Sequence, residues 1–233
     1  LWELGAEVIE IGNKPNGFNI NLQCGSMHTA KASKVVLQEQ AHLGICLDGD
    51  ADRVVLINEK GEEVNGDQVL AQIASFWKAC GRLKGPGIVA TVMSNLGLEE
   101  YLKTIGVQLK RTPVGDRYVV EEMRRSNFNL GGEQSGHIIM TDYMTTGDGL
   151  VAALQFLSAL VGEGRTASEL LNKFEPYPQL ITNVEYLLGS NIFENQSLQK
   201  TIIEAEKRLG TDGRLLIRKS GTEPVVRIMA EHH

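Results

Sequence analysis

The feature that most constrains the fold is an alternation of strand-like and helix-like segments that starts near Gly87. Apolar runs at 88–93, 107–110 and 128–131 alternate with two segments, at 98–105 and 117–125, whose apolar spacing is helical. Parallel strands need a crossover connection, and helices that alternate with strands cover the two faces of the sheet. The alternation therefore predicts a three-layer α/β domain.

Other segments flank this alternation. Upstream, we expect strands at 7–11, 18–22, 44–47 and 54–58, a helix at 28–40 and a second helix at 69–80. Downstream, we expect helices at 149–161 and 166–174, followed by a strand, a helix and two further strands.

The predicted fold class is α/β, with three-layer α/β/α domains and mixed sheets followed by a small α+β C-terminal domain. The predicted domains are a partial domain at 1–65, a second at 66–175 and the C-terminal domain at 176–233.

Composition and charge exclude several classes of protein. The formal net charge is −6 and no basic stripe is visible, which argues against nucleic acid as the partner. The longest apolar runs are too short for a membrane span, and no signal-peptide pattern opens the chain. An odd set of 3 cysteines without metal-type spacing favours reduced thiols in a cytoplasmic protein. The sequence makes no prediction of oligomeric state.

Three carboxylates at alternate positions occupy one loop between two apolar strands. Asp48, Asp50 and Asp52 follow the run 44–47, and Arg53 comes directly after them. Carboxylates at this spacing repel each other unless a cation holds them, and hard divalent cations prefer oxygen ligands. The loop therefore predicts a divalent-metal site beside a guanidinium that is suited to phosphate.

Three other interpretations of this loop remain open. An EF-hand would place Glu59 at its twelfth position, but the sixth position, which needs Gly, is Arg53. A phosphatase of the haloacid-dehalogenase type would use Asp48 as its nucleophile, although Thr or Val is expected there in place of Asp52. An exposed acidic turn is the structural alternative.

A glycine-rich loop at 131–137 carries a second set of functional groups. It offers a carboxylate, a hydroxyl and an imidazole, from Glu133, Ser135 and His137. Vicinal sugar hydroxyls need this mixture of acceptors and donors, and a histidine can exchange protons near neutral pH. The structural alternative is a turn in which backbone groups satisfy His137.

A third loop, at 218–224, joins two strands and combines hydroxyls, a glycine and cations. Such a loop forms a concave anion site without a helix, and phosphate fits it. A decorated hairpin turn is the alternative. The groups in question are Arg218, Ser220, Gly221, Thr222 and Arg227.

In this order, the stretches DGDADR, GEQSGH and RKSGTEP resemble the metal, sugar and phosphate loops of the α-D-phosphohexomutase family. The resemblance spans the whole chain. The stretches VNGDQVLAQIA, VGDRYVVEEM and TTGDGL resemble the phosphoglucosamine mutase branch in particular. Gln134 also favours that branch, because relatives that act on mannose or glucose phosphates usually have Met there.

The resemblance implies roles for these residues and an activity. Mg²⁺ would be held by Asp48, Asp50 and Asp52, and sugar hydroxyls by Glu133 and Ser135. The non-reacting phosphate would be held by Arg218, Ser220, Gly221 and Thr222, while His137 and Arg53 would assist transfer. The implied isomerase converts glucosamine 6-phosphate to glucosamine 1-phosphate through a phosphoserine and a 1,6-bisphosphate, in amino-sugar metabolism that supplies cell-wall precursors.

The chain departs from the family pattern in one respect that affects activity. The family's phosphoserine lies in a Ser-His-Asn-Pro loop of its first domain, and that stretch does not occur in these 233 residues. The chain therefore resembles the C-terminal half of the enzyme, and we expect it to be inactive alone. A phosphomannomutase/phosphoglucomutase, or a non-catalytic module that binds a sugar phosphate, are the alternative functions.

Overall fold

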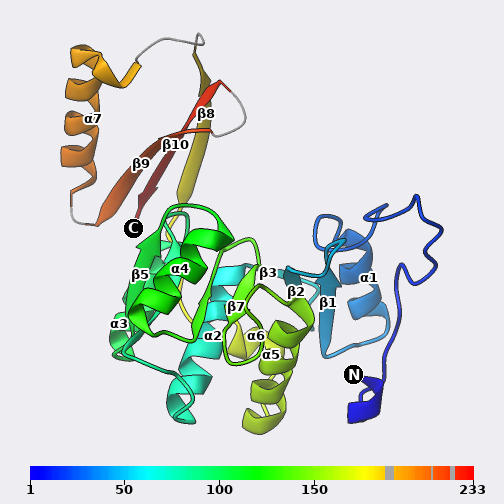
Figure 1. Cartoon of the computed structure of the whole chain (residues 1–233). Coiled ribbons are helices and arrows are strands. Elements are labelled where there is room, and N and C mark those ends of the chain that lie inside the picture. The colour runs from blue at the N-terminus through cyan, green and yellow to red at the C-terminus, as the bar shows by residue number, and fades with distance from the viewer. Residues whose placement is uncertain (187–191, 211, 221–223) are drawn as a thin grey trace. The chain divides into compact units, whose positions relative to one another are not determined.

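The computed structural model describes residues 1–186, 192–210, 212–220 and 224–233 (Figure 1). The described residues form two compact units. The first holds Leu1–Ser94 and Tyr101–Phe174, and the second holds Asn95–Glu100 and Glu175–His233. The division predicted between residues 65 and 66 falls inside the first unit and stays a proposal.

A small antiparallel sheet in the first unit carries the acidic loop. Its strand order is β1 (Leu43–Leu47), β2 (Val54–Asn58) and β3 (Glu63–Val64). Helix α1 (Ala30–Gln38) packs on β1 and β2, and its core contains Val36, Cys46 and Ile57. The strands predicted at 44–47 and 54–58 and the helix predicted at 28–40 are confirmed. Since β1 and β2 are paired antiparallel neighbours, the loop 48–53 is their hairpin connection.

The strands predicted at 7–11 and 18–22 are wrong. In the described residues 1–29 the backbone forms turns and a short 3₁₀ helix, η1 (Trp2–Leu4), but no strand. Phe18 and Ile20 are 95% and 70% exposed. A strand needs a neighbour for its backbone N–H and C=O groups, and an alternating pattern alone does not supply one.

The central sheet of the first unit is mixed, as predicted. Its order is β5 (Gln108–Thr112), β4 (Gly87–Thr91), β6 (Leu130–Gly132) and β7 (Ile138–Met140). Strand β4 runs parallel to β5 and β6, whereas β7 returns antiparallel to β6. The glycine-rich loop is therefore the connection of the β6–β7 hairpin.

Helices cover this sheet, and two of them, α2 (Gly66–Ala79) and α5 (Gly149–Glu163), come from segments that flank the predicted alternation (Figure 1). Helix α4 (Asp116–Ser126) packs on β4, β5 and β6, while α2 and α5 pack on each other and on β6 and β7, respectively. Helix α3 (Leu96–Thr104) contains residues of both units.

Two glycines in β6 show that the helices lie on opposite faces of the sheet. A Cβ at Gly131 would meet Met123 of α4 at 2.7 Å, whereas a Cβ at Gly132 would meet Leu70 of α2 at 3.4 Å. Because neighbouring residues of a strand point to opposite faces, α4 and α2 cover the two faces. The predicted three layers are confirmed.

The last helix of the first unit is shorter than predicted. Helix α6 is Ala167–Leu170 and begins with the predicted capping box of Thr166 and Glu169. It ends before residue 174 because the side chain of Gln68 competes for the next backbone groups. The amide of Gln68 accepts from Lys173 N at 2.9 Å and donates to Phe174 O at 2.8 Å.

The burial of Phe156 on α5 allows a prediction about stability. Phe156 on α5 is 0% exposed, whereas Phe18 is 95% exposed. We expect Phe156→Ala to lower the free energy of unfolding by about 3–5 kcal/mol, because it removes a buried ring and leaves a cavity. The matched Phe18→Ala should change it by less than about 0.5 kcal/mol. Urea unfolding measures both, and similar losses in the two variants would contradict the burial of Phe156 in the core.

The second unit is a small α+β domain, as predicted. Strands β8 (Gln179–Glu185), β10 (Val225–His232) and β9 (Gly213–Lys219) form an antiparallel sheet in that order. Helix α7 (Gln196–Leu209) packs on β9 and on the short 3₁₀ helix η2 (Ile192–Glu194).

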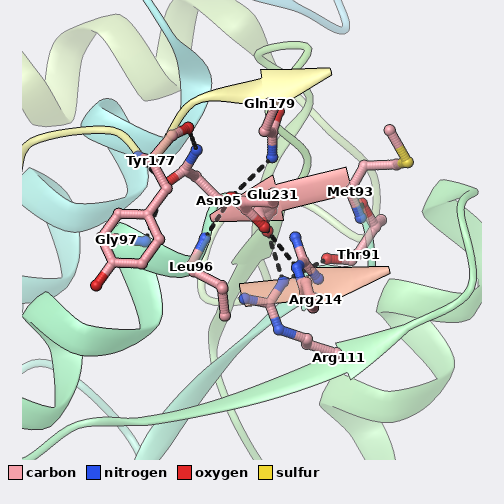
Figure 2. Close-up of polar contacts among 11 residues, drawn as sticks. Thr91, Met93, Asn95, Leu96, Gly97, Arg111, Tyr177, Gln179, Arg214 and Glu231 are labelled. Carbon is pink, nitrogen blue, oxygen red and sulfur yellow. Dashed lines mark hydrogen bonds and ion pairs between the residues drawn. The ribbon is translucent and has the colours of Figure 1, made fainter. Parts of the chain in front are cut away.

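A buried carboxylate joins several elements at one end of this second sheet (Figure 2). Glu231 is 1% exposed, and its Oε2 lies 2.5 Å from Arg214 Nε. Its Oε1 accepts from Leu96 N at 2.8 Å and from Gln179 Nε2 at 3.0 Å. A buried charge is tolerated when it is paired and hydrogen-bonded in this way. Glu231 therefore fixes the start of α3 to strands β8, β9 and β10.

Candidate functional site

The acidic loop gathers its three carboxylates at the end of the β1–β2 hairpin. Asp48, Asp50 and Asp52 each offer an oxygen within 4.8 Å of the other two. The turn is held by Arg53 N, which donates to Asp48 Oδ1 at 3.1 Å, and by a left-handed backbone at Ala51, with φ 59°. The hairpin thus brings together the three residues that the sequence predicts as metal ligands.

Within the described part of the chain, Arg53 and the ring of His137 lie within ion-pair distance of these carboxylates. Burial, and then the neighbouring carboxyl of Asp48, raises the pKa of Asp52. The Arg53 Nε lies 3.9 Å from Asp48 Oδ2 and 3.7 Å from Asp52 Oδ1, and its side chain is 46% exposed. Among the described residues, the buried Asp52 Oδ1 accepts no hydrogen bond. Clustered oxygen donors with an unsatisfied buried oxygen are the donor set that fits a hard divalent cation.

The glycine-rich loop lies directly against the acidic loop. Val54 N, at the start of β2, donates to Gly136 O at 3.1 Å. Gly136 has φ 89°, and a Cβ there would lie 2.0 Å from Val54 O, so that only glycine allows this approach. The fold therefore joins two loops that are more than eighty residues apart in the sequence.

Inside the glycine-rich loop, the predicted sugar-binding side chains lie at different depths. Glu133 is half-buried and its Oε1 accepts from Gly115 N at 3.0 Å, whereas Ser135 is exposed. The backbone of the loop is held by Gly66 N, which donates to Gln134 O at 3.1 Å. The contact between Glu133 and Gly115 carries no signal in the sequence pattern, since it joins two separate loops.

His137 contacts the acidic loop. It is 2% exposed, and its Nδ1 lies 3.1 Å from Asp52 Oδ2. Its Nε2 accepts from Gly147 N at 3.2 Å. The next residue, Asp148, caps α5 by accepting from Val151 N at 2.8 Å. The sequence pattern of residues 145–149 does not indicate the contact of Gly147 with His137.

Residues of the N-terminal segment also lie beside the acidic loop, although the sequence pattern does not indicate them. A hollow of about 380 Å³ lies beside the acidic loop. It is lined by Asp48, Gly49, Asp50 and Arg53 from the loop and by Ile20, Asn21, Ser26 and Met27 from the segment before α1.

The predicted anion loop belongs to the second unit, where the strand register explains its charge. Arg218 of β9 lies directly opposite Arg227 of β10, and Arg214 lies opposite Glu231. These pairs share one face of the sheet because they are four residues apart along each strand. At one end of this face a cation lies opposite a carboxylate, whereas at the other end two cations lie opposite each other.

Of the predicted anion-binding groups, the structure describes Arg218, Ser220 and Arg227, while Gly221 and Thr222 lie outside the described residues. Ser220 N donates to Val225 O at 2.8 Å and so closes the ladder beside the loop. The buried Arg218 Nε has no hydrogen-bond partner within the described part of the chain.

None of the helices that the structure describes combines the length and the apolar character needed to cross a membrane.

Family models match most of the chain. Residues 65–177 match the model described as phosphoglucomutase/phosphomannomutase, alpha/beta/alpha domain III. Residues 182–233 match the model described as phosphoglucomutase/phosphomannomutase, C-terminal domain.

Curated relatives agree with these models. The chain is 59% identical over 231 residues to a phosphoglucosamine mutase of Paracoccus denitrificans, and the match covers 99% of this chain and 52% of the relative. It is 58% identical over 231 residues to a phosphoglucosamine mutase of Agrobacterium fabrum, with 99% and 51% covered. The chain thus spans about half the length of the curated relatives it matches.

Solved structures share the fold at lower identity. An Aspergillus fumigatus N-acetylphosphoglucosamine mutase in complex with GlcNAc-6P and magnesium matches with a TM-score of 0.73 and 23% identity, over 93% of this chain and 54% of that one. A phosphoglucomutase/phosphomannomutase family protein from Burkholderia thailandensis matches with a TM-score of 0.71 and 22% identity, over 89% and 46%. With domain III and the C-terminal domain both matched, the chain belongs to the phosphoglucomutase/phosphomannomutase family and is homologous to the C-terminal half of phosphoglucosamine mutases.

Proposed function

We propose that the chain is the metal-binding and sugar-phosphate-binding half of a cytoplasmic phosphoglucosamine mutase. The complete enzyme would interconvert glucosamine 6-phosphate and glucosamine 1-phosphate. The observation that carries the proposal is the direct contact of the acidic loop with the glycine-rich loop, through Val54 and Gly136 and through Asp52 and His137. The 59% identity to phosphoglucosamine mutases supports the choice of glucosamine over other hexoses.

The acidic loop would hold Mg²⁺ through Asp48, Asp50 and Asp52. When bound, the ion supplies positive charge that stabilises the transferring phosphoryl group. Arg53 stands beside the three carboxylates with its side chain 46% exposed, and it would face the same phosphoryl oxygens.

The glycine-rich loop would orient the sugar. The carboxylate of Glu133 would accept from sugar hydroxyls, and Ser135 is exposed and offers both a donor and an acceptor. The non-reacting phosphate would be held by Arg218, Ser220, Gly221, Thr222 and Arg227. Binding of the remote phosphate would position the reacting oxygen. Positioning of the reacting groups accounts for much of the rate enhancement in enzymatic phosphoryl transfer.

The phosphoryl transfer would take place in two steps. In the first, the bond between phosphorus and the serine oxygen breaks while a bond to the free sugar hydroxyl oxygen forms, and the hydroxyl proton leaves as the serine oxygen regains one. The resulting 1,6-bisphosphate then reorients in the site and returns its other phosphoryl group to the serine. The serine would belong to a part of the enzyme beyond these 233 residues, so we expect the chain alone to bind but not to turn over.

Calorimetric titration of the chain with glucosamine 6-phosphate in Mg²⁺ tests this proposal. Saturable binding is expected, with weaker binding of glucose 6-phosphate and mannose 6-phosphate and no binding of glucosamine that lacks the phosphate. Preference for either hexose phosphate would favour the phosphomannomutase/phosphoglucomutase alternative. Absence of binding for all the sugar phosphates would contradict the proposed substrate site.

Arg218 provides a more specific prediction. We expect Arg218→Ala to weaken binding of glucosamine 6-phosphate about tenfold to a hundredfold, since a charge-assisted hydrogen bond contributes about 1.5–3 kcal/mol. The exposed Arg208 of α7 is the matched control, and Arg208→Ala should leave affinity unchanged. Equal affinities for the two variants, measured in the same titration, would remove Arg218 from the phosphate site.

A further inference from the structure

The segment before helix α1 forms one wall of the hollow beside the acidic loop. Ser26 N donates to Leu47 O at 3.1 Å, where β1 ends and the loop begins. Gly25 has φ 82°, and a Cβ there would lie 2.6 Å from Leu47 O, so the close approach of the segment requires glycine. The segment is therefore fixed against the end of β1, and Ser26 lines the hollow.

Asn21 lines the same hollow, at a place where two glycines leave room for its side chain. A Cβ at Gly49 would lie 3.3 Å from Asn21 Nδ2, and a Cβ at Gly25 would lie 3.3 Å from Asn21 Oδ1. The backbone of Asn21 is left-handed, with φ 58°, a conformation that asparagine adopts more readily than most residues. The amide nitrogen of Asn21 thus lies beside Gly49 of the acidic loop.

The polar groups of this wall are available to a ligand. Within the described part of the chain, neither the side-chain amide of Asn21 nor the hydroxyl of Ser26 has a hydrogen-bond partner. The side chain of Arg53 lines the same hollow and is 46% exposed. An amide N–H, a hydroxyl and a guanidinium can all donate, and phosphoryl oxygens accept.

From this arrangement we propose that Asn21 and Ser26 are further binding residues for the phosphoryl group that is transferred. The amide of Asn21 and the hydroxyl of Ser26 donate to its oxygens, beside Arg53. Asp48 and Asp50 also line the hollow and would repel an anion that arrives alone. The phosphoryl group therefore binds together with a cation on the acidic loop, and the inference rests on the proposed Mg²⁺ site.

Titration of the chain with Mg²⁺, in the presence and absence of inorganic phosphate, tests this assignment. Binding linkage is reciprocal, so phosphate that shares the hollow with the cation must raise the affinity for Mg²⁺. We expect a rise of about tenfold, measured by calorimetry against sodium chloride of the same ionic strength. The concentration of free Mg²⁺ is corrected for its binding to phosphate in solution.

Two variants remove the proposed donors one at a time. Asn21→Gly removes the amide and still permits the left-handed backbone, and Ser26→Ala removes only the hydroxyl. In each variant the phosphate-dependent rise should be about three to ten times smaller, since one hydrogen bond contributes that much. Without phosphate, both should bind Mg²⁺ as the unchanged chain does.

Asn127→Gly is the matched control for Asn21→Gly. Asn127 is also exposed and left-handed, with φ 54°, but it lies at the C-terminal end of α4. This variant should keep the full phosphate-dependent rise. Urea unfolding of each variant shows whether it is folded.

The outcomes separate this inference from the proposed function. If the unchanged chain does not bind Mg²⁺, the proposed metal site is lost and the inference with it. If it binds Mg²⁺ but phosphate does not strengthen the binding, the metal site stands and the inference is overturned. A full rise in Asn21→Gly and Ser26→Ala also overturns it. So does an equal loss of Mg²⁺ affinity with and without phosphate, because the two residues would then only shape the acidic loop.

A second measurement does not depend on a folded variant. Proton–nitrogen correlation spectra of the chain with ¹⁵N-labelled asparagine show the side-chain amide of each asparagine. We expect the Asn21 signal to shift when phosphate is added in the presence of Mg²⁺, and the Asn127 signal to stay in place. An Asn21 signal that phosphate leaves unmoved would overturn the inference.

Discussion

The Gly136→Ala variant is expected to unfold at a much lower urea concentration than the unchanged chain. An added Cβ would lie 2.0 Å from Val54 O and 3.0 Å from Val54 C, which are backbone atoms that a side-chain rotation cannot relieve. The residue also has φ 89°, where a side chain is strained. Overpacking and backbone strain each cost about 1–3 kcal/mol, so we expect a loss of roughly 2–6 kcal/mol.

Gly164 is the matched control for this variant. It also has a left-handed backbone, with φ 63°, but no atom lies within 4 Å of the position of its Cβ. Gly164→Ala should therefore lower the free energy of unfolding only by the strain of its left-handed backbone, about 1–2 kcal/mol. The fluorescence of Trp77, which is 0% exposed, reports the unfolding of the first unit. If the two variants lose the same free energy of unfolding, the close approach of the two loops is contradicted.

The Asp50→Asn variant is expected to lose Mg²⁺ affinity without losing stability. Asp50 is the exposed member of the cluster, and Asn has nearly the same shape. Loss of an outer-shell contact lowers metal affinity by up to about 100-fold. We expect the loss of a direct ligand to lower Mg²⁺ affinity by more than that. In the absence of metal, the variant should be as stable as the unchanged chain or more so, because a like charge has been removed.

Asp212→Asn is the control for this charge change, since Asp212 is an exposed carboxylate of the second unit. It should bind Mg²⁺ as the unchanged chain does. Calorimetry measures affinity, and urea unfolding in a chelator measures stability. Undiminished Mg²⁺ affinity in Asp50→Asn would show that the cluster is an acidic turn and not a metal site.

The sequence predicts those parts of the fold whose signals are local. The apolar run of β2 and the capping box at Thr166 depend on neighbouring residues, and both occur where expected. The acidic loop is predictable for the same reason, because its three carboxylates are close in the sequence and repel each other in any conformation.

The parts that the sequence does not predict depend on distant partners. The segment 18–22 alternates like a strand, but the described residues provide no neighbouring strand for it. The contact of Gly147 with His137 joins separate loops, and nothing in either loop alone indicates it. Likewise, the opposition of Arg218 and Arg227 follows from the register of β9 and β10, which a hairpin pattern leaves undefined.

A coupled mutase assay on the full-length gene product tests the central claim most directly. Glucosamine, glucose and mannose 6-phosphates are compared with Mg²⁺ and a 1,6-bisphosphate primer. We expect Mg²⁺-dependent formation of glucosamine 1-phosphate, faster than formation of the corresponding products from glucose or mannose. Release of free phosphate without any sugar 1-phosphate would contradict it and would favour a phosphatase with Asp48 as its nucleophile.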